Sequence, residues 1–159
     1  MEFRIVPAFE QDLPLILRLI KDLAEYEKLG HAVVATEAIL RESLFVKRVA
    51  EVVIGYADDE PAGFAVFFQT FSTFLGVPGM YLEDIFVEPR FRRLGLGRRL
   101  LTHLAKIAVA RGYGRMEWSV LDWNEPAIDF YKALGARPMD EWTVFRLTGD
   151  SLRRLGSAE

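Results

Sequence analysis

Apolar positions in the first third of the chain change from strand spacing to helical spacing. The run at residues 3–7 predicts a short strand. After Asp12, a candidate N-terminal cap, apolar residues recur every three or four positions, with Pro14 tolerated in the first turn. This spacing predicts a helix that ends near Gly30. A second, shorter helix is predicted from about Thr36.

The middle of the chain has the spacing of strands. Two β-rich runs within residues 50–71 flank the sequence "DDEP" at 58–61, which predicts a hairpin. The next run, "GMYLEDIFVEP" at 79–89, predicts another strand that starts after Gly79. Pro89 is expected at its end, because proline cannot donate a hydrogen bond to a sheet.

Helical and strand patterns alternate in the last third. Residues 97–111 predict a helix, 115–124 a strand and 125–136 a helix with Asn124 as its N-cap. Residues 141–149 predict the last strand. The order βααβββαβαβ predicts a mixed α/β fold.

Composition narrows the class of protein. The length of 159 residues suits one domain, so residues 1–159 are expected to form a single domain. A net charge of −3 argues against a general nucleic-acid binder, and no apolar run approaches the ~20 residues that span a membrane. There is no cysteine, and His31 and His103 lie far apart, so no metal site is expected. The N-terminus lacks the pattern of a secretory signal, which makes a cytoplasmic location the expectation.

A local basic patch stands out in this acidic chain. Residues 90–99 hold five arginines and no acid. Within them the spacing Arg92-x-x-Gly95-x-Gly97 lies between a predicted strand and a predicted helix. Unpaired N–H groups at a helix start, together with glycine turns, can cradle a phosphate. The alternative is a solvated basic turn, since a short glycine–arginine motif is weak evidence alone.

Four stretches resemble one family in order and spacing. They are "RLIKDLAEYE", "YLEDIFV", "RRLGLG" and "WNEPAIDFYKALGA". Together they resemble the GNAT N-acetyltransferase superfamily, and within it the diamine (spermidine/spermine) and thialysine acetyltransferase group. The resemblance covers nearly the whole chain. It implies a central, mostly antiparallel mixed sheet flanked by helices, and acetyl-CoA as acyl donor without a metal.

The resemblance also implies a donor site. Backbone groups of Ile85, Phe86 and Val87 would bond the pantetheine arm, and backbone N–H groups from Arg93 to Arg98 would hold the pyrophosphate. The full set of implied donor-binding residues is Ile85, Phe86, Val87, Arg92, Arg93, Leu94, Gly95, Leu96, Gly97, Arg98, Asn124, Glu125, Pro126, Ala127, Tyr131 and Lys132. Asn124 could equally be only a helix cap, and Lys132 only an exposed lysine.

Two residues take catalytic roles in this resemblance. Tyr131 would be the general acid that protonates the leaving thiolate; the alternative is a tyrosine packed on its helix. Glu83 would help to deprotonate the acceptor amine, whose pKa is near ~10.4 when free. Asp84 alternates to the other face of the strand, and is the less favoured of the two acids.

The implied acceptor site is rich in acids, which suits a cationic amine. Its residues are Tyr26, Glu27, Glu83, Glu117, Trp118, Ser119 and Asp140. The alternative is that these acids only solvate the surface. The chain departs from the polyamine acetylators at two positions. They carry an acid before an aromatic residue where this chain has Thr73 before Phe74, and a histidine where it has Glu117. A smaller thialysine-like or lysine-like amine is therefore favoured over a long polyamine.

The resemblance also implies a homodimer, with neither nucleic acid nor membrane as partner. High aromatic content supports it, because aromatics such as Phe71, Phe74 and Trp142 would need cover. Two other functions stay open. One is a protein N-acetyltransferase, and the other is a catalytically silent GNAT-fold module that binds CoA.

Overall fold

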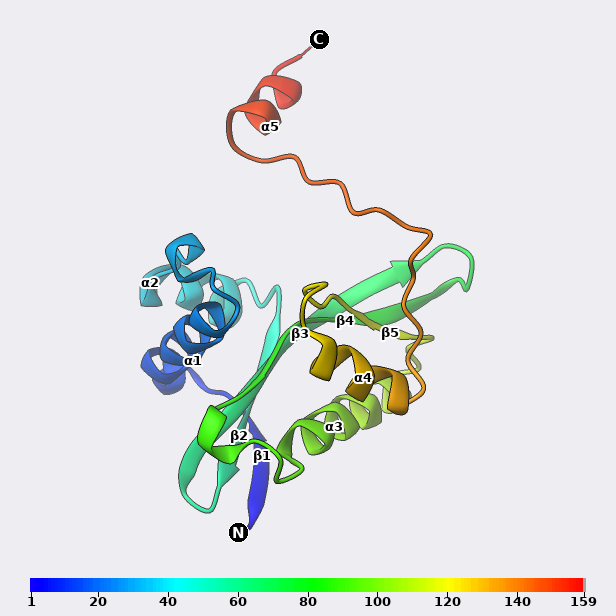
Figure 1. Cartoon of the computed structure of the whole chain (residues 1–159). Coiled ribbons are helices and arrows are strands. Elements are labelled where there is room, and N and C mark those ends of the chain that lie inside the picture. Colours follow the sequence, from blue (N-terminus) through cyan, green and yellow to red (C-terminus); the bar gives the residue numbers. More distant parts are fainter. Residues whose placement is uncertain (159) are drawn as a thin grey trace. The chain divides into compact units, whose positions relative to one another are not determined.

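The computed structural model describes residues 1–158, which divide into two compact units (Figure 1). The first unit comprises Met1–Leu121, and the second begins at Asp122. The sheet and three of the helices lie in the first unit. Its strands are β1 (Phe3–Pro7), β2 (Glu51–Ala57), β3 (Glu60–Ser72), β4 (Val77–Val87) and β5 (Met116–Trp118), and its α-helices are α1 (Leu13–Tyr26), α2 (Glu37–Arg41) and α3 (Leu96–Ala110).

The five strands form one sheet in the order β1-β2-β3-β4-β5. Neighbouring strands from β1 to β4 pair antiparallel, and only β4 and β5 pair parallel. The predicted mixed α/β class with a mostly antiparallel sheet is therefore confirmed. The hairpin at "DDEP" is also confirmed, since Asp58 and Asp59 connect β2 to β3 and Asp58 adopts a left-handed φ of 51°.

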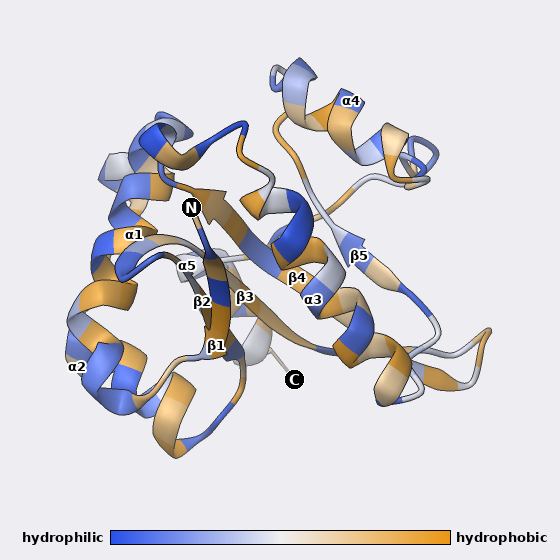
Figure 2. Cartoon of the chain, turned by 90° about the horizontal axis from the view of Figure 1, so that it is seen from below, coloured by the Kyte–Doolittle hydropathy of each residue, from blue (hydrophilic) through white to orange (hydrophobic). Residues whose placement is uncertain are grey.

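Both faces of the sheet are covered, which explains why β2 and β3 are nearly continuous apolar runs. Ile54 of β2 packs in one cluster with Ile16 and Leu19 of α1. The next residue, Gly55, faces the other way, where an added Cβ would lie 3.1 Å from a methyl of Leu96 in α3. Figure 2 shows the mixed hydrophilic and hydrophobic bands along α1 and α3 that this one-sided burial requires.

The helix starts follow their local sequence only in part. α2 begins where the sequence predicts it, and the structure shows Thr36 as its cap, with a hydroxyl that accepts a hydrogen bond from the Ile39 N–H at 3.2 Å. Asp12 is the residue before α1, but its carboxylate accepts from the Phe9 N–H at 2.8 Å and makes no cap bond to the helix. Short turns connect the main elements: 3-10 turns at Glu10–Asp12, Gly30–Ala32 and Pro89–Phe91, and a π-helical turn at Glu42–Val46.

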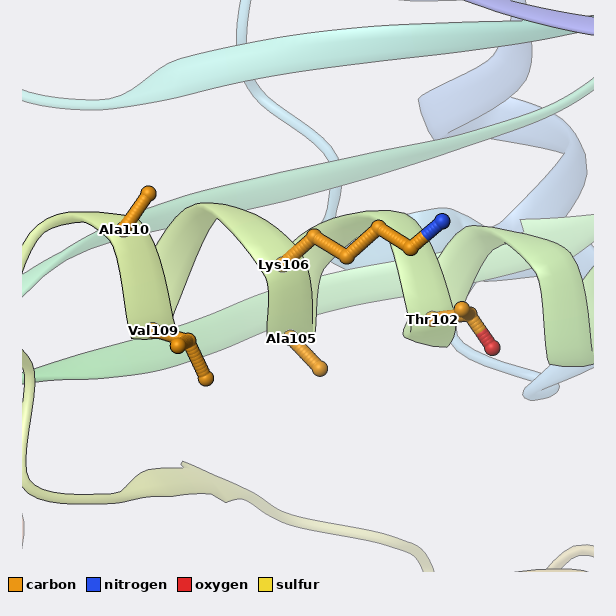
Figure 3. Close-up of a pocket in the computed structure, with 5 residues that line it drawn as sticks. All are labelled: Thr102, Ala105, Lys106, Val109 and Ala110. Carbon is orange, nitrogen blue, oxygen red and sulfur yellow. The ribbon is translucent and has the colours of Figure 1, made fainter.

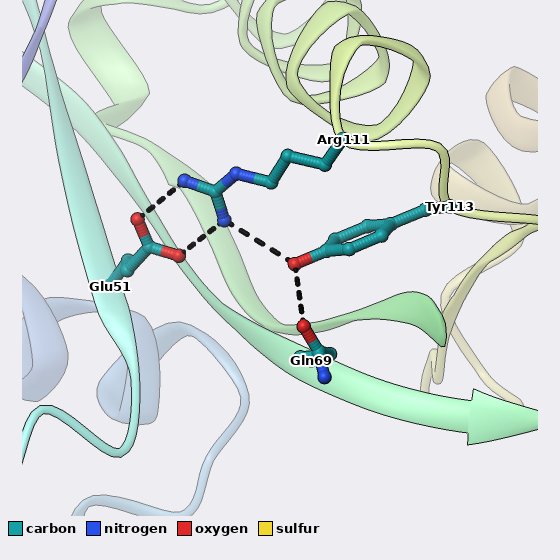
Figure 4. A network of polar contacts seen from close by, with 4 residues as sticks. All are labelled: Glu51, Gln69, Arg111 and Tyr113. Atoms are coloured by element: carbon teal, nitrogen blue, oxygen red, sulfur yellow. Dashed lines mark hydrogen bonds and ion pairs between the residues drawn. The ribbon is translucent and has the colours of Figure 1, made fainter. Parts of the chain in front are cut away.

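A polar network ties the end of α3 to the sheet (Figure 4). Arg111 binds Glu51 of β2 with two hydrogen bonds of 2.7 and 2.9 Å. The Tyr113 hydroxyl lies 3.5 Å from the same guanidinium and donates to Gln69 of β3 at 3.2 Å. The hydrogen bond to Arg111 lowers the pKa of Glu51, and the same contact raises the pKa of Arg111. The network fixes where α3 ends against β2 and β3.

The second unit contains α4 (Glu125–Ala133) and α5 (Gly149–Gly156). The last predicted strand, 141–149, is wrong: among the described residues 141–148 form neither strand nor helix, and Gly149 opens α5. β-rich composition stabilises a strand only where a partner strand and a packed face exist. Here Val144 and Phe145 are 83% and 91% exposed, so neither alternating face is buried.

Candidate functional site

The loop between β4 and α3 has the backbone of an anion-binding turn. Arg93 has a φ of 63° and Gly95 a φ of 91°. Left-handed residues in a tight turn direct successive N–H groups toward one concave side. A Cβ added at Gly95 would meet no atom within 4 Å, so the strained φ, rather than crowding, makes glycine the suitable residue here.

The start of α3 adds further donors to this loop. The N–H of Arg99 is the one that bonds the Gly95 carbonyl, at 3.1 Å. The N–H groups of Leu96, Gly97 and Arg98 precede it, and no carbonyl of their own helix lies behind them. Buried Leu96 anchors this first turn. The sequence-predicted N–H groups thus lie on one turn of backbone, with the positive end of a 15-residue helix behind them.

A β-bulge in β4 opens the strand beside this loop. Asp84 pairs with Val66 and Leu82 pairs with Phe67, so Glu83 is an extra residue without an opposing partner. The parallel pairing with β5 ends at Leu82 and Trp118. Among the described residues, positions 84–87 therefore pair with β3 alone, and Glu83 pairs with neither neighbouring strand. The predicted donor contacts Ile85, Phe86 and Val87 lie on this stretch, whose edge away from β3 is open to an extended ligand, which is the geometry of strand addition. Backbone groups of successive residues point to alternate edges, and the Val87 carbonyl accepts a hydrogen bond from Arg92.

The two neighbouring acids of β4 differ in environment. Glu83 is exposed, whereas Asp84 is half-buried. Burial, followed by the charges of Glu83 and Glu27, raises the pKa of Asp84 to about 6. Burial also raises the pKa of Glu27, which directly follows α1. The sequence favoured Glu83 over Asp84, yet it is Asp84 whose surroundings raise its pKa toward neutrality.

A further acid lies where the strand ends. Glu88 has one carboxylate oxygen, Oε1, that is buried without a hydrogen-bond partner. Burial, a hydrogen bond to Asp22 and the charge of Asp22 raise the pKa of Glu88 to about 7, while Arg18 and Arg92 oppose that rise. Neither Glu88 nor Asp22 was a predicted site residue. Their pairing joins α1 to the end of β4, which sequence spacing alone does not reveal.

Some of the predicted acceptor-site residues lie on or just after β5, next to β4. Glu117 lies opposite Tyr81 in the parallel register, and its carboxylate is 3.2 Å from Arg115. Ser119 shares a 2.8 Å hydrogen bond with the Tyr81 hydroxyl. Trp118 lies opposite Leu82. The charge of Glu117 is thus already compensated by a neighbouring arginine.

The second unit carries the remaining predicted residues. Asn124 is the N-cap of α4, and its side chain accepts a hydrogen bond from the Ala127 N–H at 3.4 Å. Tyr131 is half-buried on α4, with its ring centroid 5.7 Å from that of Phe130. Exposed residues complete this group: Glu125, Pro126, Lys132 and Asp140. The catalytic role of Tyr131 and the donor contacts of this unit stay predictions.

The outer face of α3 holds a shallow hollow of about 360 Å³ (Figure 3). It is lined by Thr102, Ala105, Lys106, Val109 and Ala110, all from one helix. None of them is a predicted site residue, and their lining is mostly apolar. This hollow supplies no chemistry for a transfer reaction.

Comparison with known proteins decides the family. The model of the acetyltransferase (GNAT) family matches residues 17–136. The chain belongs to the GNAT acetyltransferase family. This GNAT protein is 39% identical to a thialysine N-epsilon-acetyltransferase of Bos taurus, over 93% of this chain and 94% of that protein. It is 35% identical to an L-ornithine N5-acetyltransferase of Arabidopsis thaliana, over 96% and 87% of the two chains.

A solved structure shares the fold of the chain. An integron cassette protein from the mobile metagenome of V. cholerae superposes on this GNAT chain with a TM-score of 0.82 and 28% identity, covering 99% of both chains. Within residues 1–158, no helix has the length and apolar character needed to cross a bilayer. The same residues hold no cluster of three or more side chains suited to a metal ion.

Proposed function

We propose that this GNAT protein transfers the acetyl group of acetyl-CoA to a primary amine of a small cationic molecule, by direct attack in a ternary complex. The observation that carries the proposal is the direct succession of an open strand edge at 84–87 and an anion-binding turn at 92–98. An acyl-CoA combines an extended arm that contains amides with a pyrophosphate. The open strand edge suits the arm, and the turn that follows it suits the pyrophosphate.

The donor would lie along β4 with its phosphates in the loop. Backbone groups of Ile85, Phe86 and Val87 bond the pantetheine arm, and the N–H groups from Arg93 to Arg98 hold the pyrophosphate. The exposed side chains of Arg93 and Arg98 add positive charge beside this turn. Asn124 and its neighbours at the start of α4, with Lys132 at its end, complete the donor contacts.

The acceptor amine must lose a proton before it can attack. Its lone pair attacks the thioester carbonyl carbon, the carbon–sulfur bond breaks, and the departing thiolate takes a proton from Tyr131. The proton of the amine goes to the acidic pair of Glu83 and Asp84, directly or through water. Asp84 is the better matched base, because a pKa of about 6 leaves it ionised yet basic near neutral pH.

The acceptor class follows from charge and from the relatives. Tyr26, Glu27 and Asp84 lie at the end of α1 and on β4, and their two carboxylates suit an ammonium group. The relatives named above act on thialysine and on L-ornithine, which are amino acids with a side-chain amine. We therefore favour such an amino acid over a long polyamine.

We further propose that residues 1–159 work as one catalytic domain and that the protein is a cytoplasmic homodimer. The family match at 17–136 runs across the boundary between the two compact units, which supports a single domain. Phe71, Phe74 and Trp142 are 63%, 99% and 76% exposed, which supports their cover by a second copy. The cytoplasmic location rests on sequence expectation.

A thiol-release assay tests the activity. Purified protein with acetyl-CoA should release free CoA fastest with thialysine, ornithine or lysine, more slowly with diamines and polyamines, and least with aminoglycosides. Mass spectrometry of the amine should show one added acetyl group. A protein that binds acetyl-CoA but turns over no amine would be a silent module. Acetylation of intact proteins, without small-molecule turnover, would instead make it a protein N-acetyltransferase.

A further inference from the structure

Arg92 is placed unlike the other arginines of the loop. Arg93, Arg98 and Arg99 are exposed, whereas Arg92 is half-buried. Its Nε donates a hydrogen bond of 2.8 Å to the Val87 carbonyl, at the end of β4. The side chain of Arg92 is therefore directed toward the sheet and α1.

The guanidinium of Arg92 lies against two aromatic rings. Its Cζ is 4.3 Å from the ring centroid of Tyr26 and 5.4 Å from that of Phe86. The two rings are themselves neighbours, with centroids 6.3 Å apart and planes tilted by 50°. Tyr26 is the last residue of α1, and Phe86 is a buried residue of β4. One side chain thus contacts the end of α1, the core strand and the start of the loop.

This contact joins two regions with different proposed tasks. Tyr26 and Glu27 belong to the acceptor side, whereas the donor's phosphates are proposed to lie on the turn that begins at Arg92. We infer that Arg92 is a positioning residue whose stacking on Tyr26 couples the acceptor side at the end of α1 to the donor-binding loop. The inference rests on the proposed function, because it assigns the loop to acetyl-CoA.

The physical basis is the planar, always charged guanidinium. It can stack on a ring and donate to a carbonyl at the same time, which a lysine ammonium cannot do in the same geometry. A loop held in this way is preorganised, so the donor does not have to order it on binding. Because coupling between two sites is reciprocal, an acceptor that orders Tyr26 should also tighten the loop around the donor.

The test measures acetyl-CoA affinity by calorimetry with no acceptor present. Tyr26→Leu removes the ring from the proposed acceptor side and should weaken acetyl-CoA binding about three- to tenfold. Tyr26→Phe keeps the ring and should bind acetyl-CoA within about twofold of wild type. Arg92→Gln should weaken binding at least as much as Tyr26→Leu. The double variant should be no weaker than Arg92→Gln alone, since both changes remove one shared contact.

A matched control removes the same type of contact elsewhere. Arg4 of β1 lies 4.6 Å from the ring centroid of Tyr56 in β2. Tyr56→Leu should leave acetyl-CoA affinity unchanged. Hydrogen exchange of the amides at 92–98 in the ligand-free protein supplies a second measurement. Exchange should become faster in Tyr26→Leu and stay as in wild type in Tyr26→Phe.

The outcomes separate this inference from the proposed function. Wild-type protein that fails to bind acetyl-CoA refutes the proposed function, and with it the coupling. Wild-type binding that is unchanged in Tyr26→Leu overturns the coupling alone. Additive losses in the double variant also overturn it, because they assign Arg92 an independent contact to the donor. Equal hydrogen exchange at 92–98 in Tyr26→Leu and wild type would likewise overturn the preorganised loop.

Discussion

Asp84 and Glu83 are adjacent in sequence but experience different surroundings. The bulge at Glu83 leaves that carboxylate exposed, whereas Asp84 is half-buried within reach of the charges of Glu27 and Glu83. A proton acceptor for an amine works best when its pKa lies near the working pH. Asp84, whose pKa burial raises to about 6, is therefore the acid of this pair to examine first.

Asp84→Asn should lower kcat/KM for the amine by ~100- to 10,000-fold near pH 7, because the base is lost while the shape is kept. In wild type, kcat/KM should fall as pH drops through about 6, where Asp84 becomes protonated. This decrease of kcat/KM at low pH should be absent in Asp84→Asn. Glu83→Gln is the matched control and should lose less. A larger loss in Glu83→Gln, shrinking as pH rises, would instead assign the base to Glu83.

Tyr131→Phe tests the other proton transfer. The ring and its packing beside Phe130 survive, so the fold and acetyl-CoA affinity should be unchanged. The value of kcat should fall by ~100- to 10,000-fold if departure of the thiolate limits the rate. Steady-state kinetics with a fixed amine and calorimetry with acetyl-CoA measure the two quantities. A wild-type kcat across neutral and alkaline pH would return Tyr131 to a packing role.

At the scale of elements, the turn before α3 combines two left-handed residues with a helix start. Gly95→Val should strain a backbone φ of 91° and place methyl groups where the structure leaves open space. The KM for acetyl-CoA should rise by at least about tenfold, and the charge reversals Arg93→Glu and Arg98→Glu should raise it further. Gly30→Val, at a glycine with no positive φ and open space around it, is the control. Unchanged acetyl-CoA affinity in the loop variants would remove the phosphate role of the turn.

The elements with strong local signals were the ones that sequence could predict. Helical spacing found α1 and α3, "DDEP" found the hairpin, the start of α2 was found near Thr36, and Asn124 was found as a cap. These signals depend on residues within a few positions of one another. The turn before α3 was predictable for the same reason, since its glycine spacing is local, whereas its phosphate role stays a prediction.

Features that depend on distant partners could not be predicted in this way. The bulge at Glu83 arises from the register of β3 against β4, and the pKa of Asp84 depends first on burial and then on the charges of Glu83 and of Glu27, which is far away in sequence. The position of Arg92 on Tyr26 depends on where α1 ends against β4. The strand expected at 141–149 failed because strand propensity contains no information about an available partner.

At the scale of the whole molecule, the Glu51–Arg111 pair contributes a pH-dependent part of stability. The folded pKa of Glu51 is lowered, so its contribution is present above the unfolded value of about 4.5 and is lost as pH falls through the folded pKa. Glu51→Gln should lower the Tm by a few degrees at pH 7, because an exposed pair contributes up to ~1 kcal/mol. The Tm difference should vanish at acid pH. The salt bridge Arg153–Asp150, a strongly exposed pair within α5, offers the control Arg153→Gln with a smaller effect. A Tm difference that persists undiminished at pH 3 would contradict this assignment.

The proposed homodimer makes a second prediction at this scale. Light scattering at micromolar concentration should give about twice the monomer mass of 18.2 kDa. Phe74→Ser removes a side chain that is 99% exposed in the single chain, and should shift the equilibrium toward the monomer without lowering monomer stability. Val34→Ser, which also changes a strongly exposed apolar residue, serves as the control. A wild-type mass of one chain would contradict the dimer.

The open edge of β4 has a consequence for the chain before it meets its donor. The edge of β4 that faces away from β3 at 84–87 is a template on which any extended segment can form backbone hydrogen bonds, including a strand of another molecule. With acetyl-CoA bound along that edge as proposed, the donor would protect the protein from self-association as well as react with its substrate. The concentration of acyl donor in the cell would then set the fraction of the protein that does not self-associate, since bound ligand stabilises the native state by mass action.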